Sequence, residues 1–479
     1  MSQESIRVEA LVIGAGPGGY VAGIRLGQLK KKALVVERDK PGGICLNVGC
    51  IPSKALITAS KYYDKFRHGA DIGILADNIR LDMTKLQSWK GEVVSKLTGG
   101  VRQLLKANGC DYRTGTARLT SRNTVVLQEP QKGEGAEGPV LIQADNIILA
   151  TGSRPIEIPG FKFDGQLIVD STGALDFAAV PERLLVIGGG YIGIEIGTIY
   201  AKLGARVTIV EALPAILSGT DPELAQVVAR KLKKLGVEVM TGAKARSWTE
   251  KGGKAAVTLE LGGGPAGKQE ATLEVDKVLV SVGRRPNSEG LGLEEVGVMI
   301  DRGFVTTDKR MRTNVPGIYA IGDLAGQPML AHKASREAEV VAEVIAGHKA
   351  EMDVRVIPAV IFSDPEISSA GITAEEAEKK GHKVKIGKFP FAALGRAIAN
   401  ADTDGFVKVV IDADTKEVLG IHVVGNGASD IIAEAALAIE MGALADDISL
   451  TIHAHPTLPE AIMEAAKASL GEAIHIQNR

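Results

Sequence analysis

Cysteine is scarce in this chain of 479 residues, which has only three. So few cysteines exclude the disulfide framework of a small secreted protein. Neither sign of charge is in excess, because 56 basic and 58 acidic residues leave a formal net charge of −2. This balance provides no overall attraction to nucleic acid or to an anionic membrane, and it argues against a nucleic-acid function.

Long apolar runs are also missing, since none reaches the length of a transmembrane helix. The first ten residues, MSQESIRVEA, have neither the basic nor the apolar region of a secretory signal. We therefore expect a cytoplasmic protein, of about three domains by its length. A cytosol keeps most thiols reduced, so a bonded cysteine pair there would indicate redox chemistry.

A repeated pattern is the most informative feature that is present. LVIGAGPGGYVAGIRLGQLKKKALVVE begins at Leu11, and LVIGGGYIGIEIGTIYAKLGARVTIVE begins at Leu185. Each copy reads as an apolar strand, a G-x-G-x-x-G turn, a helix and a second strand that ends in an acid. The landmarks are Gly14, Gly16, Gly19 and Glu37 in the first copy and Gly188, Gly190, Gly193 and Glu211 in the second.

Glycines at a strand-to-helix turn permit a tight turn and the close approach of a pyrophosphate, and the acid can accept hydrogen bonds from a ribose. One such turn could serve packing alone, but two with matched acids predict two dinucleotide sites. The carboxylate of Glu211 would repel the 2′-phosphate of NADP, so the second site is expected to take NAD. The basic residue Arg206 lies close to Glu211 in the sequence and weighs against the preference for NAD. It is expected at the start of the same strand.

The pattern along the chain predicts an α/β protein with an α+β end. We expect a first dinucleotide domain at 1–152, a second at 153–283, a segment with a further strand at 284–355, and an α+β domain at 356–479. A long helix is predicted from Leu81 to Asn108. The glycine-rich loop Glu129–Pro139 reads as an exposed hairpin tip.

Two of the three cysteines, Cys45 and Cys50, lie in GGICLNVGCIPSK. On a regular helix their Cα atoms would be roughly 8–9 Å apart, which is too far for a disulfide. If they are bonded, the helix must be distorted, and Gly49 offers the freedom for it. The alternatives are two buried apolar cysteines or a zinc site with His453 and His455. Cys110 is expected in the core.

The segment HAHPTLPEA carries His453, His455 and Glu460 near the C-terminus. Thr457 and Glu460 have the spacing of a capping box that opens a helix. The alternative is that Glu460 orients a histidine. A cis bond before Pro456 is compatible with the sequence, and His453 could support the site or simply pack.

GGICLNVGCIPSK resembles the redox motif of the flavin disulfide reductase family. The resemblance extends along the chain through LATGSRP, VGRRPN, AIGDLAGQPMLAHKA and IHAHPTLPEA, and it departs at Ile44, where the family has threonine. It implies two Rossmann-like domains, one for FAD and one for NAD, with 284–355 completing the FAD domain and 356–479 forming the dimerisation domain. No metal is expected.

The resemblance also implies roles for individual residues. Cys45 and Cys50 would be the redox pair, with Cys50 nearer the flavin, while His455 would be the acid/base that Glu460 orients, in a homodimer where it reaches the opposite subunit. The FAD contacts would be Gly14, Gly16, Gly19, Glu37, Lys54 with its partner Glu195, Ala117, Asp323 and Ala331, and the NAD contacts would be Gly188, Gly190, Gly193, Glu211 and Gly283.

The implied reaction is the oxidation of dihydrolipoyl groups with NAD⁺ as the final acceptor. These groups would arrive on the lipoyl domain of an acyltransferase (E2) or on an H-protein. A flavoprotein that serves only as a scaffold is the alternative from another class, and the presence of both cysteines together with His455 argues against it.

Overall fold

The structure, a computed structural model, describes residues 4–130, 138–264 and 267–478. These residues belong to two compact units. The first combines Met1–Ala55, Thr84–Ile156 and Gly283–Asp353, and the second combines Leu56–Met83, Glu157–Val282 and Val354–Arg479. Residues 131–137 of the predicted hairpin tip lie outside the described part of the chain.

A seven-stranded sheet forms the centre of the first unit, in the order β3-β2-β1-β6-β5-β4 with β19 paired to β6. The pairs among β3, β2, β1, β6 and β19 are parallel, whereas β4 and β5 are antiparallel additions. The strands are β1 (Ser5–Ile13), β2 (Ala33–Glu37), β3 (Asp111–Thr114), β4 (Thr116–Ser121), β5 (Thr124–Gln128), β6 (Val140–Leu149) and β19 (Ile318–Ala320).

Both faces of this sheet are covered. Leu11 and Ile13 of β1 belong to one buried apolar cluster, and Ala10 and Val12 belong to another. A strand with alternating side chains that is buried on both faces reads as a continuous apolar run, which explains the sequence ALVI.

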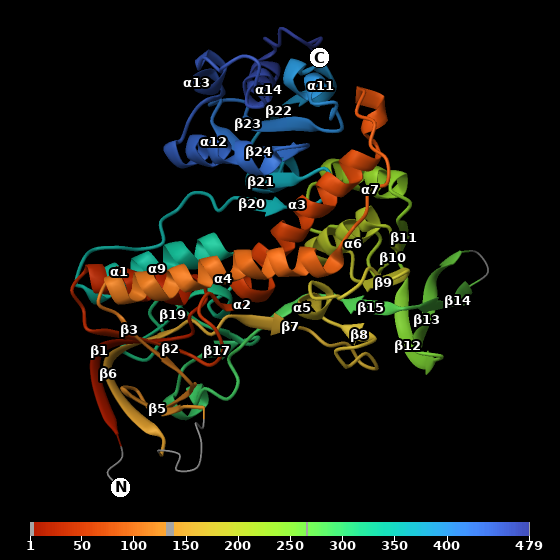
Figure 1. Ribbon diagram of the computed structural model, residues 1–479. Helices are drawn as coiled ribbons and strands as arrows, with labels where there is room; N and C mark the ends of the chain where they lie inside the picture. Colours follow the sequence, from red (N-terminus) through yellow and green to blue (C-terminus); the bar gives the residue numbers. More distant parts are fainter. Residues whose placement is uncertain (1–3, 131–137, 265–266, 479) are drawn as a thin grey trace. The chain divides into compact units, whose positions relative to one another are not determined.

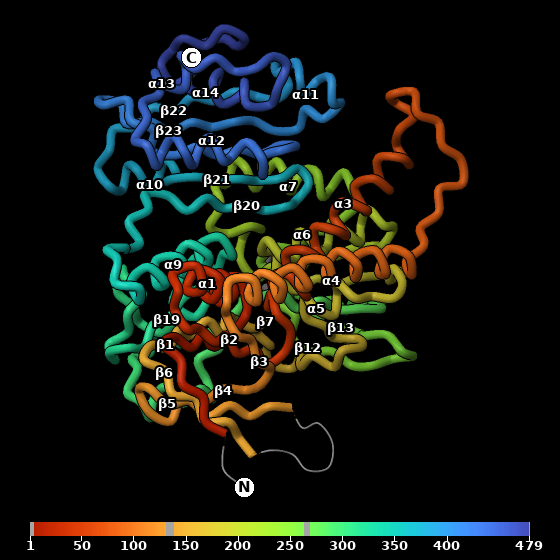
Figure 2. Tube along the Cα trace, turned by 60° about the vertical axis from the view of Figure 1, so that its left-hand side comes forward, coloured from red at the N-terminus to blue at the C-terminus, as the bar shows by residue number. Residues whose placement is uncertain are grey.

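Helices α1 (Pro17–Gln28) and α9 (Ala331–Ile345) lie side by side although they are far apart in the sequence (Figures 1 and 2). The predicted long helix is present as α4 (Met83–Ala107). The remaining elements of this unit are short: α2 (Gly43–Val48), β7 (Ser153–Pro155), β16 (Arg284–Pro286), α8 (Leu293–Val296), β17 (Ile300–Asp301), β18 (Phe304–Val305) and η2 (Gly322–Leu324).

Helix α3 (Cys50–Arg67) follows α2 directly and is followed by the short η1 (Gly69–Ile72). Among the described residues, the stretch Gly43–Arg67 is long and apolar enough to cross a membrane by length and composition. Gly49 has a non-helical backbone and divides this stretch into α2 and α3, and α3 carries five charged side chains (Lys54, Lys61, Asp64, Lys65 and Arg67). The stretch is therefore weak evidence for a membrane span.

The second unit contains a parallel sheet in the order β11-β10-β9-β15-β8. Its strands are β8 (Ile168–Val169), β9 (Arg183–Ile187), β10 (Arg206–Glu211), β11 (Glu238–Thr241) and β15 (Lys277–Val280), and its helices are α5 (Ser171–Ala174), α6 (Tyr191–Leu203) and α7 (Pro222–Lys234). An antiparallel sheet is added by β12 (Lys244–Lys251), β13 (Lys254–Gly264) and β14 (Gly267–Val275). Arg206 begins β10, as predicted.

The C-terminal part of this unit has its own antiparallel sheet, in the order β20-β21-β24-β23-β22. The strands are β20 (Ala359–Ile361), β21 (Ile367–Gly371), β22 (Val384–Pro390), β23 (Phe406–Asp412) and β24 (Val418–Val424). The helices are α10 (Ala374–Lys379), η3 (Phe391–Ala393), α11 (Gly395–Ala399), α12 (Ala428–Met441), α13 (Ala445–Leu450) and α14 (Glu460–Leu470).

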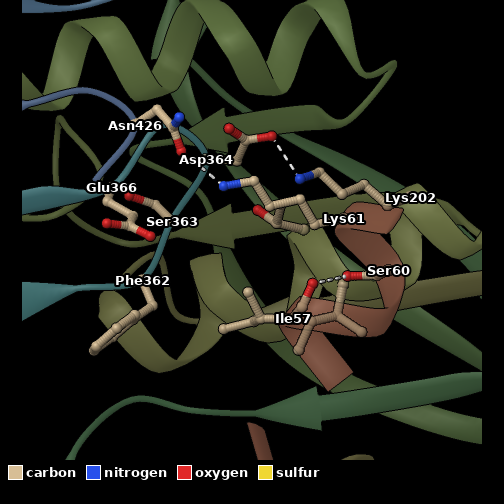
Figure 3. A pocket seen from close by; sticks show the side chains of 11 residues that line it. Ile57, Ser60, Lys61, Lys202, Phe362, Ser363, Asp364, Glu366 and Asn426 are labelled. Carbon is tan, nitrogen blue, oxygen red and sulfur yellow. Dashed lines mark hydrogen bonds and ion pairs between the residues drawn. The ribbon is translucent and has the colours of Figure 1, made fainter. Parts of the chain in front are cut away.

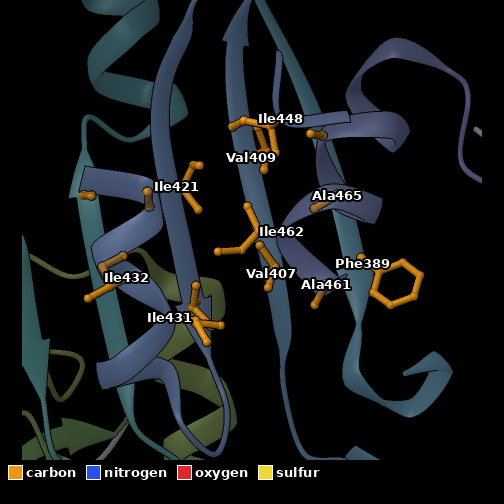
Figure 4. Close-up of a cluster of buried hydrophobic side chains, with 14 of the residues drawn as sticks. Phe389, Val407, Val409, Ile421, Ile431, Ile432, Ile448, Ala461, Ile462 and Ala465 are labelled. Carbon is orange, nitrogen blue, oxygen red and sulfur yellow. The ribbon is translucent and has the colours of Figure 1, made fainter. Parts of the chain in front are cut away.

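One face of the C-terminal sheet carries the core of this region (Figure 4). Val407 and Val409 of β23 and Ile421 of β24 pack in one cluster with Ile432 of α12 and Ile462 of α14. The predicted fold class, α/β with an α+β end, is confirmed.

Candidate active site

The two predicted dinucleotide turns have the same backbone geometry. Gly14 and Gly188 have φ angles of +106° and +112°, in the left-handed region that favours glycine. A Cβ on Gly19 would lie 1.8 Å from the carbonyl oxygen of Gly14, and one on Gly193 would lie 2.1 Å from that of Gly188. The first and third glycines of each turn are therefore required by close packing of helix on strand.

The two acids also repeat each other. Oε2 of Glu37 accepts a hydrogen bond from Ala15 N at 2.7 Å, and Oε2 of Glu211 accepts one from Gly189 N at 2.7 Å. The other carboxylate oxygen accepts from the backbone N–H two positions further on, at 3.0 and 2.8 Å. Each acid thus ties its strand end to the glycine turn, and the open N-terminus of the helix beside it fits a dinucleotide.

The middle glycines, Gly16 and Gly190, are the N-cap residues of α1 and α6. A Cβ on Gly190 would meet nothing within 4 Å, so this glycine leaves room for a ligand. Among the other predicted cofactor contacts, Ala117 is buried on β4 and Ala331 is the first residue of α9. Gly283 has a φ of +131°.

Asp323 lies in the short turn η2, which several buried polar groups hold in place. Its carboxylate accepts a hydrogen bond from Ser153 Oγ, and Arg284 Nε donates to the same Ser153 Oγ at 2.8 Å. Behind the turn, Gly322 N donates to Glu337 Oε2 at 2.7 Å, and Lys333 pairs with Glu337 at 2.8 Å.

Sequence reasoning missed the support of this turn. Lys333 and Glu337 have the i, i+4 spacing of a solvated helix pair, yet their side chains are only 7% and 5% exposed. The one available signal was their position on the helix that follows GDLAG, a turn whose unpaired backbone groups need partners.

Helix α2 is seated on the first dinucleotide turn by the glycine pair that precedes the cysteines. Gly42 N donates to Ala15 O at 2.7 Å. A Cβ on Gly43 would lie 2.6 Å from the Cα of Gly16, and both glycines of the pair have positive φ. The pair therefore brings the cysteine segment into backbone contact with the turn.

The cysteine pair lies where α2 ends and α3 begins. Gly49 separates the two helices with φ −137° and ψ −104°. The segment is therefore distorted from a regular helix, and a disulfide between the two cysteines would need such a distortion. Cys45 and Cys50 are thiols in this structure, and Cys45 makes a side-chain hydrogen bond with Cys50. Their sulfurs are therefore close enough to react with each other.

The pKa of the Cys45 thiol is raised far above its ordinary value of 9.0. The largest cause is the hydrogen bond with Cys50, followed by burial and by negative charge on Cys50, while the charge of Lys54 acts in the opposite direction. Cys110 is different: it is buried in the core, and burial raises its pKa to about 12, which makes it an inert cysteine.

Lys54 and Glu195, the predicted partners, lie in different units of the structure. Lys54 Nζ donates to Ser53 Oγ at 3.4 Å. Glu195, on α6, is buried and accepts a hydrogen bond from Phe362 N at 2.9 Å.

The histidine end combines the two alternatives left open by the sequence. Glu460 Oε1 contacts His455 Nδ1 at 2.9 Å, and its Oε2 accepts from Thr457 N at 2.7 Å. The Thr457 hydroxyl instead donates to Ala454 O, so the capping box is only half formed. The His455–Pro456 bond is cis.

Glu460 therefore holds the imidazole of His455, whose side chain is 77% exposed and open to a reaction partner. Burial acts to raise the pKa of Glu460, but the hydrogen bonds from Thr457 N–H and His455 outweigh it and lower that pKa below the ordinary value of 4.5. The carboxylate is ionised at neutral pH and can stabilise a cationic imidazole.

His453 contacts Glu434 Oε1 through Nε2 at 2.8 Å and Thr451 O through Nδ1 at 2.9 Å. Its side chain is buried, so it braces the segment that carries His455. Within residues 4–130, 138–264 and 267–478, no three His, Cys, Asp or Glu side chains group so that they could hold a metal ion.

Comparisons with known proteins agree with this geometry. Residues 8–338 match the pyridine nucleotide-disulphide oxidoreductase family, and residues 357–466 match the dimerisation domain of the same family. The chain is 51% identical to a dihydrolipoyl dehydrogenase of Geobacillus stearothermophilus, over 98% of each chain. It is 50% identical to one of Bacillus subtilis, again over 98% of each chain.

Solved structures give the same result. LpdA of Mycobacterium tuberculosis superposes with a TM-score of 0.87 at 26% identity, covering 96% of this chain and 99% of that one. The HOCl-induced flavoprotein disulfide reductase RclA of Escherichia coli gives 0.83 at 25% identity, covering 95% and 98%. The chain therefore belongs to the pyridine nucleotide-disulphide oxidoreductase family, whose members are flavoprotein oxidoreductases that use FAD and NAD.

Proposed function

We propose that the chain is a dihydrolipoyl dehydrogenase, which oxidises dihydrolipoyl groups on the lipoyl domain of an acyltransferase or on an H-protein and reduces NAD⁺. The observation that carries this proposal is the hydrogen-bonded thiol pair on a helix seated against a dinucleotide turn. A thiol pair in this position is suited to exchange electrons with a bound dinucleotide. The naming of relatives at 51% and 50% identity supports the same substrate.

We assign FAD to the first turn, with Gly14, Gly16, Gly19 and Glu37, and NAD to the second, with Gly188, Gly190, Gly193 and Glu211. When bound, FAD supplies the two-electron link between the dithiol and NAD⁺. The further FAD contacts are Lys54 with Glu195, Ala117, Asp323 and Ala331, and the further NAD contact is Gly283. The domains would be 1–152, 153–283, 284–355 and 356–479, and the protein would work in a bacterial cytoplasm.

The protein residues carry the disulfide chemistry. His455 takes the proton of a substrate thiol, and the thiolate attacks Cys45 of the oxidised pair, which breaks the Cys45–Cys50 bond and leaves the electron pair on Cys50. The second substrate thiol gives up its proton and attacks the first substrate sulfur, which closes the lipoyl ring and releases Cys45 as a thiolate. Cys45 takes up that proton, in line with its raised pKa. The substrate loses two electrons and the pair gains them.

The proposed assembly is a homodimer in which His455 serves the cysteine pair of the partner subunit. The family match of residues 357–466 to a dimerisation domain supports a dimer. Exposed apolar side chains on α12, at the end of α13 and just after it support it as well, because such groups are normally covered. They are Leu437, Met441, Leu450 and Ile452.

The test is an anaerobic titration of the purified holoprotein with one equivalent of dihydrolipoamide, followed by visible spectroscopy and by an NAD⁺ reduction assay. We expect flavin absorbance with a long-wavelength thiolate-to-flavin band, and loss of both the band and turnover in Cys50→Ser. Cys110→Ala is the matched control and keeps both. Absence of bound flavin, or turnover that survives Cys45→Ser with Cys50→Ser, contradicts the proposal.

A further inference from the structure

The turn that joins the antiparallel strands β20 and β21, residues 362–366, contacts helix α6 at two points. Phe362 N donates to Glu195 Oε1 at 2.9 Å, and Asp364 Oδ2 pairs with Lys202 Nζ at 2.5 Å. Glu195 and Lys202 are seven residues apart on α6, which places them on one face about 10 Å apart along the axis. The Phe362 contact holds Glu195, a predicted site residue. The Asp364 contact holds the segment to which Phe362 belongs.

The second contact is a buried ion pair. The Lys202 side chain is 5% exposed and that of Asp364 is 24% exposed. Burial acts to raise the pKa of Asp364, but the charges of Lys202, Lys231 and Lys61 outweigh it and lower that pKa. The Asp364 carboxylate is therefore ionised, and replacing either partner breaks an ion pair that is largely buried.

The ion pair lines a small hollow beside the segment and α6, which has both polar and apolar side chains in its wall (Figure 3). Thr198 of α6 lines it, and its Oγ1 has no hydrogen-bond partner in the described part of the chain although the residue is 4% exposed. Across the hollow, Lys61 of α3 donates to Asn426 at 2.8 Å. Strand pairing between β20 and β21 fixes the two ends of the segment, and the ion pair is the charged contact that ties its turn to α6.

We propose that Lys202 and Asp364 are positioning residues for Glu195: their ion pair fixes the 362–364 segment so that the Phe362 N–H stays on the Glu195 carboxylate. The inference rests on the proposed function, in which Glu195 partners Lys54 beside the flavin. A shift of the segment moves the carboxylate that the proposed function places at the flavin. The steps that involve the flavin slow, whereas thiol exchange at Cys45 does not.

The test separates these two steps in the holoenzyme. Stopped-flow spectroscopy follows reoxidation of the dithiol-reduced enzyme by NAD⁺, and alkylation with mass spectrometry follows thiol exchange between dihydrolipoamide and Cys45. In Asp364→Asn we expect NAD⁺ reoxidation to be about tenfold slower and the long-wavelength band to shift, because small misplacements of a positioned charge have effects of this order. Thiol exchange stays within about twofold of wild type.

Two further variants make the result specific. Lys202→Arg keeps the charge and restores the reoxidation rate to within about threefold, whereas Lys202→Met behaves like Asp364→Asn. Thr198→Val alters the same hollow but neither contact, and it leaves both steps unchanged. If Lys202→Met does not fold, Asp364→Asn decides alone, since it keeps an oxygen acceptor and nearly the same shape.

Reoxidation at the wild-type rate in Asp364→Asn with an unshifted band, even with a lower melting temperature, would overturn the positioning role and leave the pair merely structural. Slowing of thiol exchange to the same degree as reoxidation would overturn it too. A wild-type enzyme that dihydrolipoamide does not reduce at all would instead refute the proposed function, so the two failures are distinguishable.

Discussion

Glu460 is a single carboxylate with two tasks. One oxygen receives the Thr457 N–H, which helps to fix the turn before α14, and the other receives His455. Sequence spacing offered these as alternatives, because a capping pattern and a histidine partner use the same residue types. The structure combines them since a carboxylate has two oxygens and can accept from both directions.

The lowered pKa of Glu460 predicts an acid-dependent stability. Because its folded-state pKa lies below the ordinary 4.5, the ionised carboxylate contributes stability that is fully present above about pH 4.5 and is lost as the pH falls through the folded value. We expect Glu460→Gln to lower the free energy of unfolding by about 1–2 kcal/mol at pH 7. Denaturant unfolding from pH 3 to 7 measures the difference from wild type, which should vanish at the acid end.

The same variant should lose activity by about 10²-fold at neutral pH, because the His455 imidazole loses its charged partner. The matched control is Glu472→Gln, in an exposed residue after α14. A stability difference that persists unchanged to pH 3 would contradict the assignment of the lowered pKa to these hydrogen bonds.

Helix α7 is anchored to the C-terminal sheet by a buried cation. Lys408 of β23 has a 9% exposed side chain and lies 2.7 Å from Asp221, the N-cap of α7, and 2.7 Å from Glu223 in its first turn. Burial acts to lower the pKa of Lys408, but the hydrogen bonds to both acids raise it overall. The two carboxylates also lie at the positive end of the helix dipole.

We expect Lys408→Met to lower the free energy of unfolding by about 3–5 kcal/mol, because Asp221 would keep a buried charge without its counter-ion. Lys234→Met, which removes an exposed pair with Asp404 at 3.4 Å, is the control and costs at most about 1 kcal/mol. Urea unfolding of both variants measures this. Equal effects of the two substitutions would show that Lys408 is not the anchor.

The elements themselves were largely predictable where a local pattern determines them. The two strand–turn–helix copies, the long helix α4 and the change to an α+β pattern near residue 355 all follow from periodicity and glycine placement. The buried position of Lys408 was not predictable, because a lysine in FVKVVID reads as a solvent-facing position of an alternating strand. Its partners come from a distant helix, and no local pattern records such a contact.

The candidate site was likewise predictable only in part. The glycine turns, the cysteine pair and the Glu460–His455 contact lie within short stretches or in repeated motifs, and the sequence placed them. The Lys333–Glu337 support of the Asp323 turn and the Lys202–Asp364 pair depend on burial, which spacing alone does not reveal.

The exposed apolar side chains on α12, at the end of α13 and just after it bear on the assembly of the enzyme. Ile452 is 96% exposed, beside the buried His453 and close in sequence to His455. We expect Ile452→Asp to weaken the proposed dimer, because a charge at an apolar interface must be desolvated. Sedimentation velocity should show a monomer that remains folded by circular dichroism and has lost at least about 10²-fold of its dihydrolipoamide activity.

Leu75→Asp, at another exposed apolar position of 84% exposure, is the control and keeps the dimer and the activity. A fully active Ile452→Asp monomer would refute the idea that each site needs the partner subunit.

The doubled hydrogen bonding of Glu211 limits how the nucleotide preference of such an enzyme can evolve. The side chain that would face the ribose also fastens the glycine turn, through Gly189 N and the backbone two residues on. Replacing Glu211 with arginine to bind a phosphorylated cofactor would also remove both hydrogen bonds that hold the turn. A switch of coenzyme must therefore be preceded by a substitution elsewhere that secures the loop.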